Sequence, residues 1–223
     1  MFQFIVDGLI WMLDQIVALT GSYGVAIILV TLLVRLALVP LTLKQTRSMA
    51  VMRELQPKLQ ELQNKYKDNP QELNNHMIKL YREHDINPLG GCLPLLIQLP
   101  IIWAFLRALQ SITPLPETVT FLGLWDLTLS AKDAAAMGAV QGLIYLLLPA
   151  LAVLTTYLQT KQTATDPSQK SMLVMMPVMI GLFSYSFPTG LVLYWVISNA
   201  FSIVQQALIS RKYPISSQGG QPK

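Results

Sequence analysis

The sequence has 223 residues, of which 52% are hydrophobic and 13% are charged, with a net charge of +4 at pH 7. Soluble domains usually carry about 25% charged residues, so this composition argues against a soluble protein and for lipid as the solvent. The single cysteine, Cys92, excludes a disulfide framework within the chain. Apolar runs of about 17 to 21 residues recur between charged segments, and each is long enough to cross a hydrocarbon core of about 30 Å.

From these runs we predict an all-α membrane protein with five transmembrane helices. The predicted spans cover residues 23–43, 93–109, 138–158, 171–187 and 191–209. They belong to one core over residues 21–210, in which residues 110–137 form an outer connection and Phe187–Gly190 forms a tight turn. The tail, residues 211–223, is rich in Gly, Ser, Gln and Pro and is predicted to be disordered.

Residues 1–20 are predicted to form an amphipathic helix. Gln3, Asp7 and Asp14 fall on one stripe at helical spacing, opposite a face of large apolar side chains. A helix with this pattern lies in the membrane interface rather than crossing the bilayer. A sixth span is the competing interpretation, but two carboxylates and a polar stripe argue against it.

Basic residues are unevenly distributed between the two sides of the membrane that five spans define. Thirteen of the sixteen lie in residues 44–91, in the loop at 161–170 or in the tail. Arg107 and Lys132 lie toward the other side. Because basic loops stay in the cytoplasm, the N-terminus is predicted outside and the C-terminus inside.

Residues 44–91 are predicted to form an antiparallel helical hairpin in the cytoplasm. Apolar residues recur every three or four positions in both arms, Asp68-Asn69-Pro70 supplies the turn, and Pro57 kinks the first arm or begins a new helix. A mere spacer needs no amphipathic stripe, so a docking surface is favoured over a spacer. The candidate docking residues are Arg53, Lys58, Lys65, Lys79 and Arg82.

Arg35 carries the strongest functional signal, because it lies inside the first predicted span. It is 12 residues from the outer end of that span and eight from the inner end, or about 18 Å and 12 Å along a helix. Burying an arginine there costs about 2.5–3.5 kcal/mol on insertion scales. Snorkelling of the guanidinium to the cytoplasmic surface is one escape, and it is marginal at this depth. An ion pair is the other, but no Asp or Glu occurs inside the five spans.

The remaining partners of Arg35 are water and neutral polar side chains. The candidates within the spans are Thr31, Gln98, Gln141, Tyr145, Ser184, Ser198, Asn199 and Ser202. A cation with only neutral neighbours is tolerated where water reaches it. We therefore predict a hydrated groove in the membrane that opens to the cytoplasm and whose positive charge attracts carboxylates.

The second and fourth predicted spans have only 17 residues each, about 25 Å of helix, so they should thin the bilayer locally. Their candidate apolar contact residues are Leu96, Ile101, Met172, Met175, Met176 and Met179. Methionine side chains adapt to varied apolar partners. Ordinary packing or lipid contact is the competing interpretation for these methionines.

No site for bond chemistry is visible in the sequence. His76 and His84 have no Cys neighbours, and neither a phosphate-binding Gly loop nor a Ser/His/Asp set occurs. We therefore expect no enzyme activity, no metal site and no cofactor.

Several motifs, in order along residues 20–210, resemble those of the YidC/Oxa/Alb membrane-protein insertases. They are Val34-Arg35, Pro40–Gln45, Leu55–Leu59, Asn87–Pro94, Phe187–Trp195, Ser198-Asn199 and Gln205-Gln206. The resemblance implies five helices around a hydrophilic groove that is open to cytoplasm and lipid but closed outside. It implies that Arg35 lies in the groove, with Thr31 and Trp195 near the substrate path, and that the second and fourth spans form a hydrophobic slide.

The resemblance also implies partners and a location. Nascent membrane proteins are the expected substrates, and the ribosome, a targeting factor, the Sec translocon and the lipid bilayer are the expected contacts, without sequence-specific nucleic acid. The expected location is the bacterial inner membrane, and the absence of a large extracytoplasmic domain resembles the compact type of the family.

We predict an insertase and chaperone that moves nascent hydrophobic segments from the cytoplasm into the bilayer without covalent catalysis. A small anion transporter or channel is the main alternative, but it would need polar residues in the outer half of the first span, where Val25–Leu29 is apolar. A chaperone for membrane-complex assembly alone is the third possibility.

Overall fold

The computed structural model describes residues 2–84, 93–111, 119–163 and 170–212, so nearly all of the predicted disordered tail lies outside the described residues. Within these ranges the chain forms α-helices and one two-stranded sheet, which confirms the helical class. It divides into two compact units, one of residues 1–39 and 94–203 and the other of residues 40–93 and 204–223.

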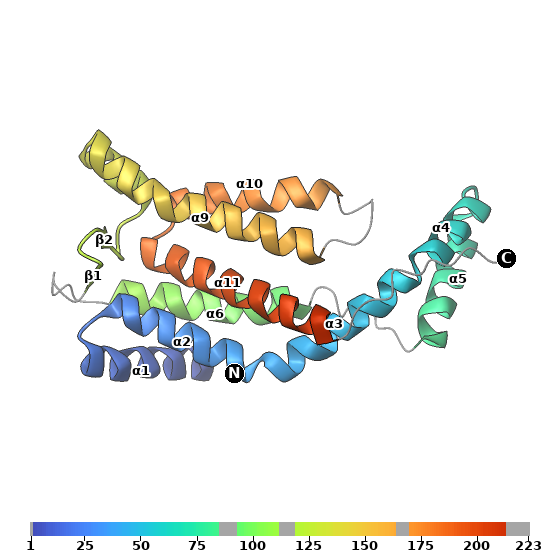
Figure 1. Cartoon of the computed structure of the whole chain (residues 1–223), viewed down its shortest axis with the longest axis horizontal. Coiled ribbons are helices and arrows are strands. Elements are labelled where there is room, and N and C mark those ends of the chain that lie inside the picture. The colour runs from blue at the N-terminus through green and yellow to red at the C-terminus, as the bar shows by residue number, and fades with distance from the viewer. Residues whose placement is uncertain (1, 85–92, 112–118, 164–169, 213–223) are drawn as a thin grey trace. The chain divides into compact units, whose positions relative to one another are not determined.

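Unit 1 contains the helices that position Arg35. Its elements are α1 (Phe2–Thr20), α2 (Tyr23–Ala37), α6 (Leu93–Ser111), β1 (Thr120–Phe121), β2 (Trp125–Asp126), α8 (Ala131–Met137), α9 (Ala139–Thr163), α10 (Lys170–Ser186) and most of α11 (Thr189–Lys212). In Figure 1, α2, α6, α10 and α11 run roughly along one direction. One core joins them, because Ile27 and Val30 of α2, Phe105 of α6 and Tyr194 of α11 are each at most 2% exposed.

Among the described residues, three helical segments are long and apolar enough to cross a membrane: Gln3–Thr20, Ala139–Gln162 and Thr189–Ile209. The bent pair Tyr23–Ala37 and Val39–Thr46 makes a fourth if it is counted as one span, and Ser171–Ser186 is a shorter apolar helix. These segments support a multi-pass membrane protein. The count of five spans stays a prediction.

The first predicted span, residues 23–43, is not one straight helix. α2 ends at Ala37, and α3 (Val39–Glu54) begins after a bend of 56°. Pro40 explains the break, because it has no N–H to donate to the carbonyl of Leu36 and its ring would clash with that carbonyl. The prediction missed this bend. α3 continues past residue 43 to Glu54, within the segment predicted as the first arm of the hairpin.

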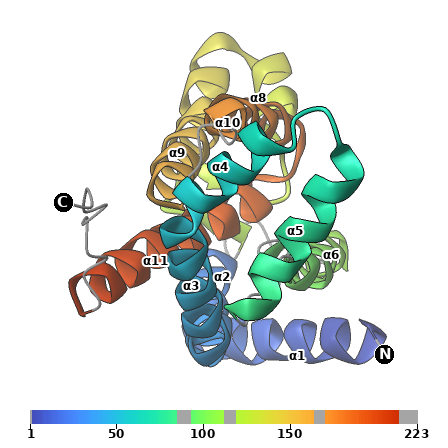
Figure 2. The same cartoon turned by 90° about the vertical axis from the view of Figure 1, so that its right-hand side faces the viewer.

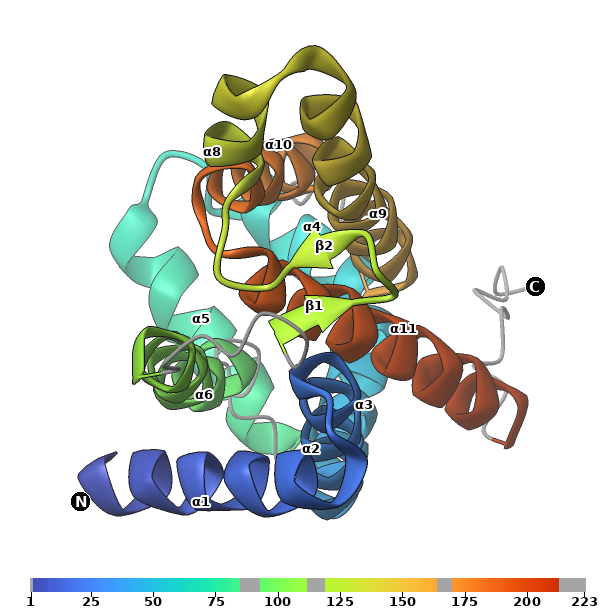
Figure 3. The same cartoon turned by 90° about the vertical axis from the view of Figure 1, so that its left-hand side faces the viewer.

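α1 lies across the neighbouring helices of unit 1. In Figure 3, α2 and α6 are seen nearly end-on, whereas α1 is seen from the side. Val6, Leu9 and Leu13 are buried against the core, and Phe4 and Trp11 on another face are exposed. This crosswise orientation is the one that an interfacial helix would have, but α1 also qualifies as a span by its length and composition. Its interfacial location stays a prediction.

Unit 2 contains α3, the end of α11, and a helical hairpin of α4 (Gln56–Lys65) and α5 (Pro70–Glu83), whose two arms are seen in Figure 2. Pro57 lies in the first turn of α4, so it begins a new helix, as one of the two predicted alternatives. Asn69 caps α5, because its side chain accepts a hydrogen bond from the Glu72 backbone N–H at 3.3 Å. The ring of Tyr66 stacks on that of His76, with 4.5 Å between centroids, and joins the two arms.

The predicted outer connection contains more structure than the sequence indicated. β1 and β2 pair in antiparallel fashion, and α8 follows with a capping box of Ser130 and Asp133. The backbone carbonyl of Leu129 accepts hydrogen bonds from the N–H and the hydroxyl of Thr189, at 2.8 and 2.6 Å. The connection therefore holds the predicted turn between α10 and α11, which the structure confirms at Phe187 and Pro188.

Gly24 provides the first test of this packing, because a Cβ atom added there would lie 2.1 Å from Cδ2 of Phe121 on β1. We expect Gly24→Ala to lower the free energy of unfolding in detergent by about 1–3 kcal/mol, as overpacking does. Thermal and denaturant unfolding would measure the change. Gly8→Ala is the matched control, since nothing lies within 4 Å of its added Cβ. Equal stability of the two variants would contradict the contact between α2 and β1.

Asp133 provides a second test, because hydrogen bonds from the Ser130 hydroxyl and backbone N–H, at 2.6 and 3.1 Å, hold the pKa of its carboxyl below the ordinary value of 3.8. A lowered folded-state pKa stabilises the fold above the unfolded-state pKa, and this contribution is lost as the pH falls through the folded-state pKa. We expect Asp133→Ala to reduce the hydrogen-exchange protection of α8 at pH 7 and the difference from the parent protein to shrink below pH 3.8. A difference that does not change with pH would exclude the carboxylate as its cause.

Candidate functional site

Arg35 lies in the last turn of α2 and is partly buried in unit 1. Its Nε donates a hydrogen bond to Oγ of Ser198 on α11 at 2.7 Å, and its Nη2 contacts the same oxygen. Ser198 is 1% exposed, so the guanidinium is drawn toward the protein interior rather than along its own helix. Snorkelling of Arg35 in a membrane stays an untested alternative, and the contact with Ser198 points the guanidinium the other way.

Two more polar side chains extend this contact across α11 to α6. Tyr194 lies one turn before Ser198 and is 2% exposed, and its hydroxyl interacts with that of Ser198. Gln98 of α6 donates a hydrogen bond from Nε2 to the Tyr194 hydroxyl. Together, Arg35, Ser198, Tyr194 and Gln98 form a polar network that links α2, α11 and α6; we call it the Arg35 network.

Among the described residues, the Arg35 network brings no carboxylate to the guanidinium, because its other members are a serine, a tyrosine and a glutamine. Neutral oxygens orient a guanidinium but do not cancel its charge. The desolvation cost of the cation is therefore repaid only in part, and an anionic group that came near would be attracted strongly in this poorly screened setting. The arrangement can hold a fixed cation at one place in unit 1.

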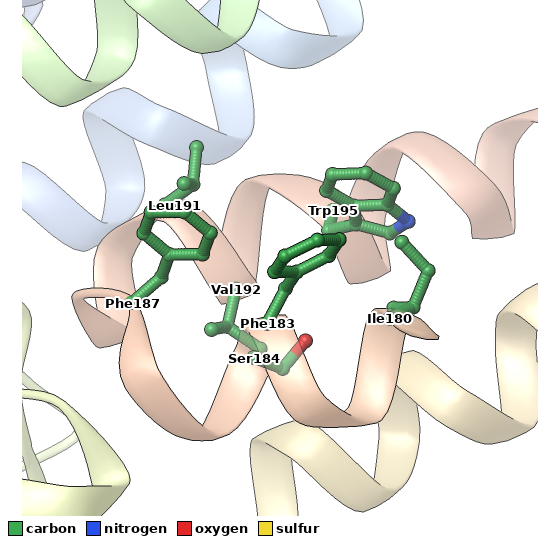
Figure 4. A pocket seen from close by; sticks show the side chains of 7 residues that line it. All are labelled: Ile180, Phe183, Ser184, Phe187, Leu191, Val192 and Trp195. Carbon is green, nitrogen blue, oxygen red and sulfur yellow. The ribbon is translucent and has the colours of Figure 1, made fainter. Parts of the chain in front are cut away.

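Thr31 and Trp195 lie close in sequence to members of the Arg35 network, but their side chains make other contacts. Thr31 is 1% exposed, and its hydroxyl donates back to the Ile27 carbonyl at 2.6 Å, within its own helix. Trp195 points instead toward α10, as Figure 4 shows. It lines a mainly apolar pocket with Ile180, Phe183, Ser184, Phe187, Leu191 and Val192.

The other predicted groove and slide residues are not all brought together. Gln98 joins the Arg35 network, whereas Gln141 is exposed in the first turn of α9. Ile101 is buried in the core. Met172, Met175, Met176 and Met179 are 36–56% exposed and form one apolar surface on α10. Leu96 lies in α6, but its side chain is outside the described part of the chain.

The predicted docking residues of the hairpin lie in unit 2. Lys58, Lys65, Lys79 and Arg82 are exposed on α4 and α5. Lys65 also lies over the Tyr66 ring, with its Nζ 5.4 Å from the centroid. Arg53 belongs to α3, and its side chain is outside the described part of the chain.

Sequence analysis named Ser198 among the candidate neutral partners of Arg35 but missed Tyr194, which lies beside it in the network. The signal for Tyr194 was its spacing of four residues from Ser198, which places both on one face of α11. It also missed the role of the Gln205-Gln206 pair in unit 2. Gln205 donates a hydrogen bond to the Thr42 hydroxyl, and the Thr46 hydroxyl lies 3.4 Å from Oε1 of Gln206, so polar side chains connect α3 to the end of α11.

Comparison with known proteins identifies close relatives of this chain. The membrane protein insertase YidC of Wolinella succinogenes is 41% identical over 211 residues, which cover 93% of this chain and 37% of the relative. The membrane protein insertase YidC of Haemophilus ducreyi is 42% identical over 215 residues, with the same coverage of both chains. The chain thus spans a little over a third of the length of these relatives, and the expectation of a compact type stays a prediction.

A solved structure and a family model agree with these relatives. The crystal structure of an active YidC insertase, with its first transmembrane domain resolved, has a TM-score of 0.70 and 31% identity to this chain, and covers 93% of this chain and 46% of the solved one. The model of the 60Kd inner membrane protein family matches residues 15–217. The chain therefore belongs to the 60Kd inner membrane protein family, the family of the YidC membrane protein insertases.

Proposed function

We propose that this chain inserts nascent hydrophobic segments into the bacterial inner membrane, and that the Arg35 network receives the polar flank of each segment. The observation that carries this proposal is the charge of Arg35, which has the neutral Ser198 and no carboxylate as its hydrogen-bonding partner in the part of the chain that the structure describes. A short flank that enters the bilayer brings polar and often acidic groups with it. A fixed cation lowers the cost of holding those groups for a short time.

The driving force of insertion is the transfer of the apolar client segment into lipid, about 25 cal/mol for each Å² of apolar surface removed from water. The protein need only lower the barrier for the polar flank, so neither a cofactor nor a nucleotide is required. Water that reaches Arg35 from the cytoplasm would hydrate the flank and offset the desolvation of the guanidinium. No covalent step is part of this mechanism.

The exposed methionine surface of α10 supports a path for the client. Met175 and Met179 are 56% and 43% exposed, and their flexible thioether side chains can contact apolar segments of many shapes. α10 has 17 residues, about 25 Å, which is short of a standard bilayer and favours local thinning. We infer that the client leaves along α10 and that thinning shortens the path of its flank.

We also propose partners for the hairpin and an orientation for the chain in the membrane. The exposed cations of α4 and α5 suit contact with the ribosome, a targeting factor or the Sec translocon. Acidic residues lie beside them, including Glu72 in the first turn of α5, and their charge would help to select among such surfaces. The N-terminus would lie outside and the C-terminus in the cytoplasm.

An anion transporter or channel is less well supported, because the half of α2 before Thr31 is apolar.

Arg35→Ala tests the role of the charge directly. We expect insertion of a client with an acidic flank into reconstituted proteoliposomes to fall about tenfold, since a charge-assisted contact is worth about 1.5–3 kcal/mol. Arg35→Lys, which keeps the charge, should retain more activity than Arg35→Ala. The matched control is Lys132→Ala, which removes an exposed cation from α8. Full insertion by Arg35→Ala would remove Arg35 from the mechanism.

Water access to position 35 is a separate test, and the single natural cysteine makes it practical. In a Cys92→Ser background, Arg35→Cys should react with a membrane-impermeant maleimide added from the cytoplasmic side. Val30→Cys, at a position that is 0% exposed in the core, should react at least about tenfold more slowly. An unreactive cysteine at position 35 would contradict a hydrated groove, even if insertion depends on the arginine.

A further inference from the structure

One face of α6 is exposed from its middle to its C-terminal end, and its polarity changes along the way. Leu99, Trp103 and Arg107 are spaced four residues apart and are exposed, with 55% exposure for Leu99 and for Trp103. The opposite face is packed in the core through Ile101, Ala104, Phe105 and Ala108. The exposed face thus presents an aliphatic side chain, then an indole, then a cation to the surroundings of the helix.

The cation and the indole are in contact. The guanidinium carbon of Arg107 lies 5.4 Å from the centroid of the Trp103 ring, a cation–π distance. Helical side chains point toward the N-terminal end of their helix, so Arg107 folds back over the preceding turn and away from the last carbonyls of α6. The stacked indole limits the rotation of the guanidinium, which leaves its N–H donors oriented for a further partner.

The depth of this pair follows from the neighbouring Leu109. A Cβ atom added at Gly190, just after the α10–α11 turn, would lie 2.7 Å from Cδ2 of Leu109. Leu109 is therefore level with the turn at which α10 ends and α11 begins. Arg107 lies two residues earlier, about 3 Å along the axis. We take these helix ends to mark the membrane interface, where tryptophan side chains gather at the level of the lipid headgroups.

We propose that Arg107 and Trp103 bind the phosphodiester of a phospholipid in the leaflet at the C-terminal end of α6, with an acyl chain lying along Trp103 and Leu99. A planar guanidinium matches phosphate oxygens in a bidentate manner. The gradient from aliphatic to aromatic to cationic follows that from acyl chain to headgroup in one lipid. An acidic client flank would share the charge preference but not the need for an aliphatic surface immediately beneath the cation.

A lipid-binding titration of the whole chain tests this site. Delipidated protein in detergent would be titrated with phosphatidylglycerol, and bound lipid would be counted by native mass spectrometry. We expect Arg107→Gln to weaken binding about fivefold, as loss of one cation from an anionic lipid surface does. Lys132→Gln is the matched control, because it removes an exposed cation outside the α6 face, and it should bind as the parent protein does.

A second measurement keeps the proposal testable if Arg107→Gln disturbs the fold. Brominated phosphatidylglycerol should quench part of the tryptophan emission of the parent protein, and Trp103→Phe should remove that part. Equal lipid affinity of the parent and a folded Arg107→Gln variant would overturn the site. Displacement of the lipid by millimolar inorganic phosphate would show that the site binds anions in general. Displacement by a peptide with an acidic flank would assign the site to clients. Either result would overturn the lipid assignment.

Discussion

The structure depends on how one guanidinium is accommodated in an apolar helix bundle. Arg35 is oriented by the Ser198 hydroxyl, which is itself buried beside Tyr194 on α11. Replacing this arrangement by an ion pair would satisfy the cation more fully, but a carboxylate on α11 would also cancel the charge. Neutral partners fix the position of the cation and leave its charge available. This compromise is costly for stability and useful for binding an anionic group for a short time.

Holding such a group requires that the helices around it be fixed elsewhere. The connection between α6 and α9 does this at one end of unit 1, where Leu127 and Leu129 accept hydrogen bonds from the backbone at Gly190 and Thr189. Phe121 packs where Gly24 leaves room, at the start of α2. These contacts bind the start of α2 and of α11 to their neighbours. The Arg35 network lies farther along both helices, so rigidity at one end can coexist with polarity in the middle.

The sequence was sufficient for the helical class and for the family, because long apolar runs and motifs in a fixed order can be read directly along the chain. The role of Arg35 stays a prediction. The sequence was not sufficient for the bend after Ala37, although Pro40 marked the place, since a proline can either kink a helix or stand in the first turn of the next. The partners of Arg35 required tertiary packing, because Ser198 is 163 residues away. Gln141 and Ile101 show the same limit: residue type suggested a role, but the rotation of each helix decided which way the side chain faces.

Arg35 and Arg107, which both lie in apolar helices, differ in a way that follows from their surroundings. Arg35 interacts with buried hydroxyls, so its charge faces the interior of unit 1, while Arg107 stacks on an exposed indole and faces outward. A cation that faces inward can act on a segment passing through the protein, whereas one that faces outward can act only on what surrounds it. If the two proposals hold, loss of Arg35 changes what the protein does to a client, loss of Arg107 changes how lipid binds to α6, and the two effects are separable.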